Sequence, residues 1–101
     1  MAVPALIVAP QFSMRRSVVD GTPDKEGIFC LWQVEDVLYV GQASDLRGAL
    51  IEHLEGRHVC TKHATHYSWC IVRDADVAYR EALAYYYEVH ASLPPCNAMD
   101  R

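Results

Sequence analysis

The chain has 101 residues, of which 51% are hydrophobic and 22% charged, with a formal net charge of -4 and a pI near 5.6. This length supports one domain with a small core and excludes a second catalytic domain. The acidic balance argues against tight, nonspecific binding to nucleic acid, because that affinity comes mainly from Lys and Arg at phosphates. A local basic patch is still compatible with the acidic net charge.

The N-terminal segment from Met1 to Pro10 is apolar, contains two prolines and has no positive leader. We expect an irregular arm or an edge strand packed on the domain, since the segment is too short to span a bilayer. The stretch from Phe12 to Val19 predicts a short helix or turn. Without a targeting or transmembrane segment, the sequence predicts a soluble, cytoplasmic protein with no membrane contact.

Two short apolar runs follow, Gly27–Trp32 and Val37–Gly41, with Glu35 and Asp36 between them. Their β-branched and aromatic residues predict two strands of a hairpin, although the usual Asn-Gly or Asp-Gly turn signal is absent. The pattern leaves the turn type open.

A helix of about three turns is predicted next, because Ser44 or Asp45 offers an N-cap oxygen and Gly56 suits a C-terminal cap. Its apolar positions recur at helical spacing: Leu46, Ala49, Leu50, His53 and Leu54.

The run from Tyr67 to Val72 predicts a third strand, and a second helix runs from about Val77 to about Ala91. Asp74 or Asp76 caps that helix, and the prolines at 94–95 end it. The order ββαβα predicts an α+β fold: a small three-stranded antiparallel sheet flanked by helices. We expect a single domain over residues 1–101, with an N-terminal arm and loop over 1–26 and a core over 27–97.

Three tripeptide or tetrapeptide motifs in order resemble one known family. Gly27-Ile28-Phe29 and Tyr39-Val40-Gly41 are similar to the two motifs of the GIY-YIG nuclease domain, and Pro94-Pro95-Cys96-Asn97 is similar to its closing segment. The resemblance spans Gly27 to Asn97 and implies the GIY-YIG-like fold.

The resemblance also implies a chemistry. In the family a tyrosine phenol helps to activate water, an arginine stabilises the attacked phosphate, and a glutamate holds one divalent metal ion, Mg²⁺ or Mn²⁺ in an active member. Carried over, it marks four candidate catalytic residues here: Tyr39, His53, Glu81 and Asn97.

The chain departs from that pattern at three positions. Phe29 replaces the first tyrosine, and Ala49 stands where the arginine is expected. Counting back from Asn97 by the spacing common in relatives puts Tyr85 at the glutamate position, one turn beyond Glu81. Arg47 lies about 200° around the helix from Ala49 and cannot replace it. The sequence therefore predicts a nuclease-like domain with impaired catalysis that binds nucleic acid or a protein.

Two other functions stay open at this point. One is an active metal-dependent DNA endonuclease that uses Tyr39, His53 and Glu81 and recruits Arg47 or Arg57. The other is a protein-interaction module that does not bind nucleic acid. Each candidate residue also has a structural reading: His53 as a half-buried cap of the apolar stripe, Glu81 as a surface ion-pair partner, and Tyr39 and Asn97 as supports of the fold.

A histidine-rich loop follows the first helix. His58, Cys60, His63 and His66 have ligand types that zinc favours, but histidines in a polar loop are more often solvated, so no metal ligands are assigned. Arg47, Arg57 and Lys62 are the candidate nucleic-acid-binding residues. They predict weak, salt-dependent DNA binding that strengthens below about pH 6.5 as histidines gain charge.

Two further patterns bear on partners and on redox state. The second helix carries tyrosines on almost every side, Tyr79, Tyr85, Tyr86 and Tyr87, which predicts a homodimer or protein contact through it. The four cysteines are widely spaced, Cys30, Cys60, Cys70 and Cys96, and we expect free thiols in a reducing compartment.

Overall fold

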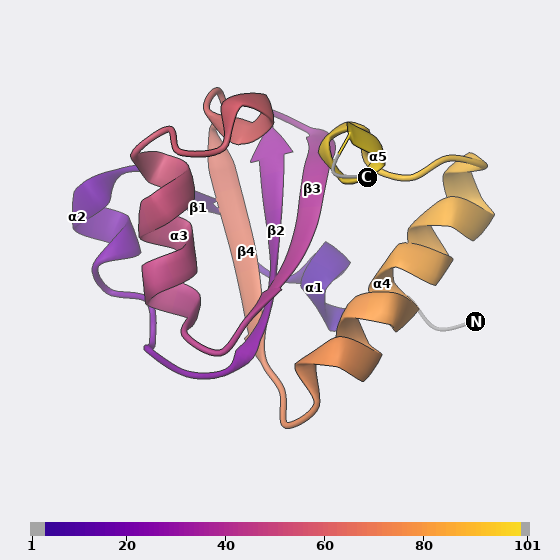
Figure 1. The fold of residues 1–101 in the computed structure, drawn as a ribbon, viewed down its shortest axis with the longest axis horizontal. Coiled ribbons are helices and arrows are strands. Elements are labelled where there is room, and N and C mark those ends of the chain that lie inside the picture. Colours follow the sequence, from indigo (N-terminus) through magenta and orange to yellow (C-terminus); the bar gives the residue numbers. More distant parts are fainter. Residues whose placement is uncertain (1–3, 100–101) are drawn as a thin grey trace.

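The computed structural model describes residues 4–99. The core elements are β2 (Gly27–Gln33), β3 (Asp36–Ala43), α3 (Leu46–Leu54), β4 (His66–Ile71) and α4 (Ala75–His90). Their order is the ββαβα succession predicted from the sequence, and Figure 1 shows α3 and α4 lying on opposite sides of the sheet. The α+β class is therefore confirmed.

The sheet has four strands, so the prediction of three was wrong. A two-residue strand, β1 (Phe12–Ser13), pairs antiparallel with β4, and the strand order is β1-β4-β2-β3. So short a strand shows no alternation in the sequence, because its existence depends on the neighbour that it pairs with. Helix α2 (Arg16–Val19) accounts for the rest of the predicted short helix.

The N-terminal arm also differs from the prediction over its described part. Residues Ala5–Val8 form one helical turn, α1, instead of an irregular arm or edge strand. Leu6 is 1% exposed and packs in the core, while its carbonyl oxygen accepts a hydrogen bond from Ser68 Oγ at 3.0 Å. Packing against the sheet, more than helix propensity, holds so short a helix.

The hairpin between β2 and β3 sets the register of the sheet. Phe29 pairs with Gly41 and Leu31 with Tyr39, and a bulge follows before Trp32. Val34 begins the two-residue turn with a φ of 58°, in the left-handed region that β-branched residues rarely adopt. Thus a strained valine occupies the turn position where the sequence offered no glycine or asparagine.

Both long helices begin at predicted capping residues. Asp45 Oδ1 accepts a hydrogen bond from Gly48 N at 3.1 Å, and Asp74 Oδ1 accepts one from Val77 N at 3.2 Å. Each carboxylate satisfies a backbone donor that the first helical turn leaves unpaired. Helix α4 ends at His90, and its C-cap residue Ala91 has a left-handed φ of 57°.

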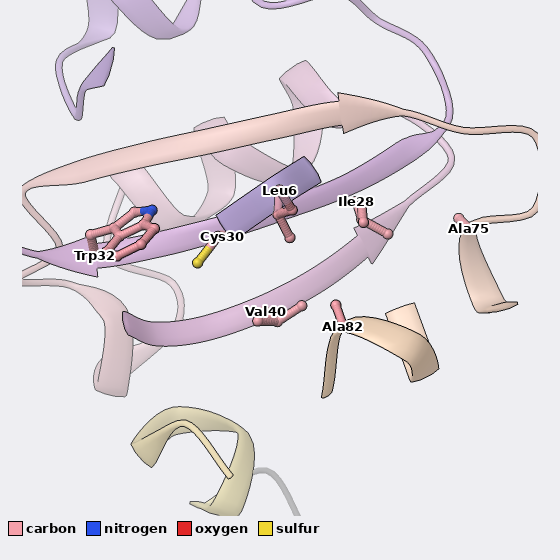
Figure 2. Close-up of a cluster of buried hydrophobic side chains, with 7 residues drawn as sticks. All are labelled: Leu6, Ile28, Cys30, Trp32, Val40, Ala75 and Ala82. Atoms are coloured by element: carbon pink, nitrogen blue, oxygen red, sulfur yellow. The ribbon is translucent and has the colours of Figure 1, made fainter. Parts of the chain in front are cut away.

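Two apolar clusters lie on the two faces of the sheet because successive side chains of the central strand β2 point in opposite directions. On the α4 face, β2 and β3 pack against α1 and α4 (Figure 2): Leu6, Ile28, Cys30, Trp32, Val40, Ala75 and Ala82. On the α3 face the cluster consists of Val19, Phe29, Leu31, Leu46, Leu50 and Tyr67. The sheet therefore lies between the inward-facing side chains of α3 and those of α4.

Two further short elements were not predicted. A 3-10 turn, η1 (Val59–Thr61), follows α3, and a one-turn helix, α5 (Pro95–Met99), closes the described chain beside the edge strand β3 (Figure 1). None of the helices within residues 4–99 has the length and apolar character needed to cross a membrane.

Candidate functional site

A small cavity of about 90 Å³ lies on the α3 face, beside β3. Its lining comes from four elements: β3, α3, the loop with η1, and α5. The lining residues are Tyr39, His53, His58, Cys60, Thr61 and Cys96. The sequence singled out Tyr39 and His53 as candidate catalytic residues, and the structure brings these two together here.

His53 is the central residue of the cavity and is only 6% exposed. Its ring centre lies 5.4 Å from that of Tyr39 and 5.5 Å from that of Phe29, and its ring stacks on His58 at 4.1 Å. His53 Nδ1 lies 2.6 Å from Thr61 Oγ1, and that hydroxyl also lies 3.3 Å from the His58 carbonyl oxygen. Since a hydroxyl has one proton, donation to the carbonyl leaves Thr61 Oγ1 to accept from Nδ1–H of His53.

Phe29, at the position of the first motif tyrosine, is buried behind this cavity. Its ring packs against Gly41, where a Cβ atom would come within 2.7 Å of Phe29 Cε1 and 2.8 Å of Tyr39 Cε2. The second motif glycine is thus required by close packing of two aromatic rings, a reason that holds with or without catalysis.

Asn97 joins α5 to the exposed edge of the sheet. Its side-chain oxygen accepts a hydrogen bond from Val40 N at 2.8 Å, and its side-chain nitrogen donates to Val40 O at 2.9 Å. The amide thereby pairs with both backbone groups of one edge-strand residue, as a neighbouring strand would. Asn97 is 6% exposed and supports the wall of the cavity.

A disulfide between Cys60 and Cys96 links η1 to α5 at the cavity rim. The expectation of four free thiols was wrong for this pair, because residues 36 apart in sequence become neighbours only when both elements pack beside β3. Cys30 and Cys70 are free, as expected. Neither Thr61 nor the disulfide was found by sequence reasoning, because both contacts form only when the loop with η1 packs against α3 and α5.

The histidine-rich loop does not form a zinc site among the described residues. Cys60 is bonded to Cys96, His58 stacks on His53, and His66 Nδ1 lies 2.8 Å from Thr65 Oγ1 on the start of β4. Within residues 4–99 no group of three or more His, Cys, Asp or Glu side chains is arranged to hold a metal ion.

Glu81 is not brought to the cavity. It is exposed on α4 and lines a second, apolar cavity of about 450 Å³ on the opposite face of the sheet, together with Tyr85 and Cys70. The two residues considered for the family's glutamate position, Glu81 and Tyr85, therefore both lie on the α4 face. The described lining of the α3-face cavity offers imidazole, phenol, hydroxyl and disulfide groups, whereas Mg²⁺ and Mn²⁺ prefer carboxylate oxygens. This set does not fit the divalent cation that the fold implies.

The candidate basic residues also separate. Arg47 Nε donates to the Thr22 carbonyl oxygen at 2.7 Å and thereby joins the start of α3 to the loop before β2. Arg57 is exposed, and its guanidinium lies 3.3 Å from the Glu55 carboxylate. Lys62 is exposed in the same loop after α3. Ala49 packs beside the α3-face cluster, so no guanidinium stands at that position.

Perturbed pKa values occur on the α4 face. Burial raises the pKa of the Cys30 thiol to about 12, and a hydrogen bond with Ser68 offsets part of the rise. Burial, and secondarily the charge of Asp36, raises the pKa of the Tyr86 phenol. Neither residue lines the cavity with His53, so these shifts arise from burial on the α4 face and do not concern the α3-face cavity.

Solved structures of a GIY-YIG endonuclease domain share this fold. The N-terminal endonuclease domain of UvrC from Thermotoga maritima, bound to its catalytic divalent cation magnesium, matches with a TM-score of 0.59 and 18% identity over 80% of this chain and 92% of that chain. A variant of the same domain with an asparagine replaced by alanine gives 0.60 and 16% over 80% and 91%. No family model and no curated protein matches the sequence. The chain thus has the GIY-YIG endonuclease fold.

Proposed function

We propose that this domain uses the GIY-YIG fold to bind nucleic acid weakly and has lost efficient phosphodiester hydrolysis. The observation that carries the proposal is the separation of the expected groups by the sheet. Tyr39 and His53 line a cavity on the α3 face, whereas Glu81 lines a different cavity on the α4 face.

The carboxylate matters more for this argument than the missing phenol. In the UvrC domain, variants with a single tyrosine replaced by phenylalanine are still bound to the divalent cation. Phe29 by itself therefore does not argue against cation binding, for which the position of the carboxylate matters. Without a carboxylate for the cation and without an arginine at position 49, two sources of transition-state charge stabilisation are absent, each worth about 2 to 4 kcal/mol.

The binding surface that we propose surrounds the α3-face cavity. Arg57, Lys62 and His63 are exposed on the loop after α3, and His58 is 49% exposed at the cavity rim. Glu52 lies 3.7 Å from His58 Nε2, so acidic groups offset much of this charge at neutral pH. Because basic and acidic side chains nearly cancel on this surface, we expect binding that depends on salt and that strengthens as imidazoles gain protons.

Hydrolysis is tested by incubating the purified protein with plasmid and with nicked or branched duplexes, in Mg²⁺ or Mn²⁺. We expect no cleavage by the wild type above the level of a Glu81→Ala variant. Cleavage by the wild type that Glu81→Ala abolishes would contradict the proposal, because it would require Glu81 to act at the site.

Binding is tested separately by fluorescence anisotropy with a labelled duplex at pH 6 and pH 7.5 over a salt series. We expect tighter binding at pH 6, and Lys62→Glu and Arg57→Glu should each weaken it and reduce the salt slope by roughly one unit per lost phosphate contact. Arg73→Glu is the matched control, since Arg73 is exposed in the loop between β4 and α4, outside this surface. Equal effects of all three variants would show that net charge alone determines binding.

A further inference from the structure

The outer face of α4 carries a regular stripe of exposed residues. It consists of Val77, Arg80, Ala84, Tyr87, Glu88 and Ala91, all on the side of the helix opposite the buried Ala75 and Ala82. In Figure 1, α4 lies at the margin of the molecule, and no labelled element lies beyond it. Tyr87 is 56% exposed and Val77 is 41% exposed, so both side chains are available for a contact with a partner.

This stripe, hereafter the α4 stripe, is self-complementary about Ala84. Arg80 and Glu88 each lie four residues from Ala84, and Val77 and Ala91 each lie seven residues from it. Four and seven residues correspond to about one and two helical turns, so Val77, Arg80, Ala84 and Glu88 share one side of α4, and Ala91 is the C-cap that follows its last turn. If two copies of α4 cross antiparallel at Ala84, Arg80 of each copy faces Glu88 of the other, and Val77 faces Ala91.

We propose that the α4 stripe is the contact of a two-fold symmetric homodimer in which the two α4 helices pack antiparallel at Ala84. An isologous interface requires a patch that matches its own inverted copy, and the opposite charges of Arg80 and Glu88, equally spaced on either side of Ala84, have that property. Alanine at the crossing point allows close approach of the helix axes. In a parallel arrangement, Arg80 would face Arg80 and Glu88 would face Glu88, so the charges select the antiparallel one.

The same charges disfavour a nucleic acid as the occupant. The exposed ionised groups of α4 include Asp76, Glu81 and Glu88 against one arginine, Arg80. Phosphates would be repelled by this surface, whereas a second copy supplies the matching arginine. The shape of this surface also favours a helix as partner. Leu83, Tyr87 and Leu93 line a shallow groove of about 690 Å³ along the stripe.

Because the α4 stripe and the α3-face cavity lie on opposite sides of the sheet and share no residue, dimerisation leaves the α3-face cavity accessible. It covers part of the 450 Å³ cavity on the α4 face, because Ala84 lines that cavity. The proposal is thus independent of the proposed function, and either can fail alone. A single helix pair buries less area than a standard stable interface, so we expect a dissociation constant in the micromolar range or weaker.

Sedimentation velocity over a concentration series from low micromolar to near millimolar tests the proposal. We expect a monomer–dimer equilibrium in the wild type. Arg80→Glu and Glu88→Arg should each weaken association about tenfold, because each places two like-charge pairs in the interface. The double variant R80E/E88R should restore association to near the wild-type value, since it re-forms the pairs with the signs exchanged.

Three controls keep the result decisive. Ala84→Glu places two carboxylates at the symmetry axis and should give a monomer at every concentration. Lys25→Glu reverses an exposed charge away from the stripe and should leave association unchanged. Arg80→Glu also loses the 2.8 Å pair with Asp76, so circular dichroism is needed to show that each variant is folded. A wild type that stays monomeric throughout, or a double variant that associates no better than the single ones, would overturn the proposal.

Discussion

The two faces of the sheet are built differently. The α4 face contains a mostly apolar cavity of about 450 Å³, whereas the α3 face has a cavity of about 90 Å³ bounded by polar side chains and a disulfide. On the α3 face a histidine pair, a threonine hydroxyl and a disulfide meet beside the edge strand. A fold that in UvrC serves a metal-dependent endonuclease here encloses a polar cluster whose described lining has no carboxylate.

The largest expected contrast concerns the two free thiols, both on the α4 face. Cys30 is fully buried with a pKa raised to about 12, so roughly one molecule in ten thousand carries the thiolate at pH 8. Cys70 is half-buried and lines the open cavity. Iodoacetamide at pH 8 should therefore alkylate Cys70 at least a hundredfold faster than Cys30, as measured by peptide mass spectrometry.

Equal labelling of both thiols in the folded protein would show that the α4 face opens as a whole. Labelling in denaturant is the control, because both cysteines should then react at similar rates. Comparable rates only in denaturant would confirm that the difference belongs to the native packing.

The second prediction concerns the covalent link on the α3 face. Replacing both Cys60 and Cys96 by serine should lower the free energy of unfolding by about 2 to 4 kcal/mol, since the bond closes a long loop in the unfolded chain. Urea unfolding followed by tryptophan fluorescence measures the change. Cys70→Ser, at a half-buried free thiol, is the matched control and should cost less. No loss of stability in the double variant would mean that the link between η1 and α5 adds nothing.

The third prediction compares added volume on the two faces. Gly41→Ala should cost about 1 to 3 kcal/mol, because its Cβ would press on the rings of Phe29 and Tyr39. Ala78→Leu, which extends into the cavity on the α4 face, should change stability by less than about 1 kcal/mol. Thermal unfolding measures both.

Gly21→Ala serves as the reference for loss of glycine freedom, since its nearest neighbour, Val18 O, would lie at an ordinary 3.4 Å. If Gly41→Ala behaved like Gly21→Ala, the close packing of the α3 face would be disproved.

The smallest expected effect lies in the hairpin turn that both faces share. Val34→Gly should raise the free energy of unfolding by about 0.5 to 1 kcal/mol, because glycine adopts the φ of 58° without the steric cost that valine carries. Val59, exposed and without a positive φ, is the control, and Val59→Gly should not stabilise. Destabilisation by Val34→Gly would mean that the turn is not strained.

Local signals determined the parts of the fold that depend on neighbours in sequence. Asp45 and Asp74 were identifiable as caps because each bonds a backbone group three residues away, and the runs over β2 and β3 were identifiable because a strand in a core must be apolar. The glycines of the two motifs were found through the family resemblance, and the structure gives the physical reason for them: a Cβ atom at Gly27 would come within 2.8 Å of Leu46 Cδ1, and one at Gly41 within 2.7 Å of Phe29 Cε1.

Tertiary structure alone decided the rest. The strand β1, the helices α1 and α5 and the Cys60–Cys96 bond exist through partners far along the chain, and none has a periodicity of its own. The sequence placed His53 and Glu81 on two helices, but each helix packs on the face that its loops and apolar stripe select. That choice puts the sheet between the imidazole and the carboxylate, and it separates the candidate site.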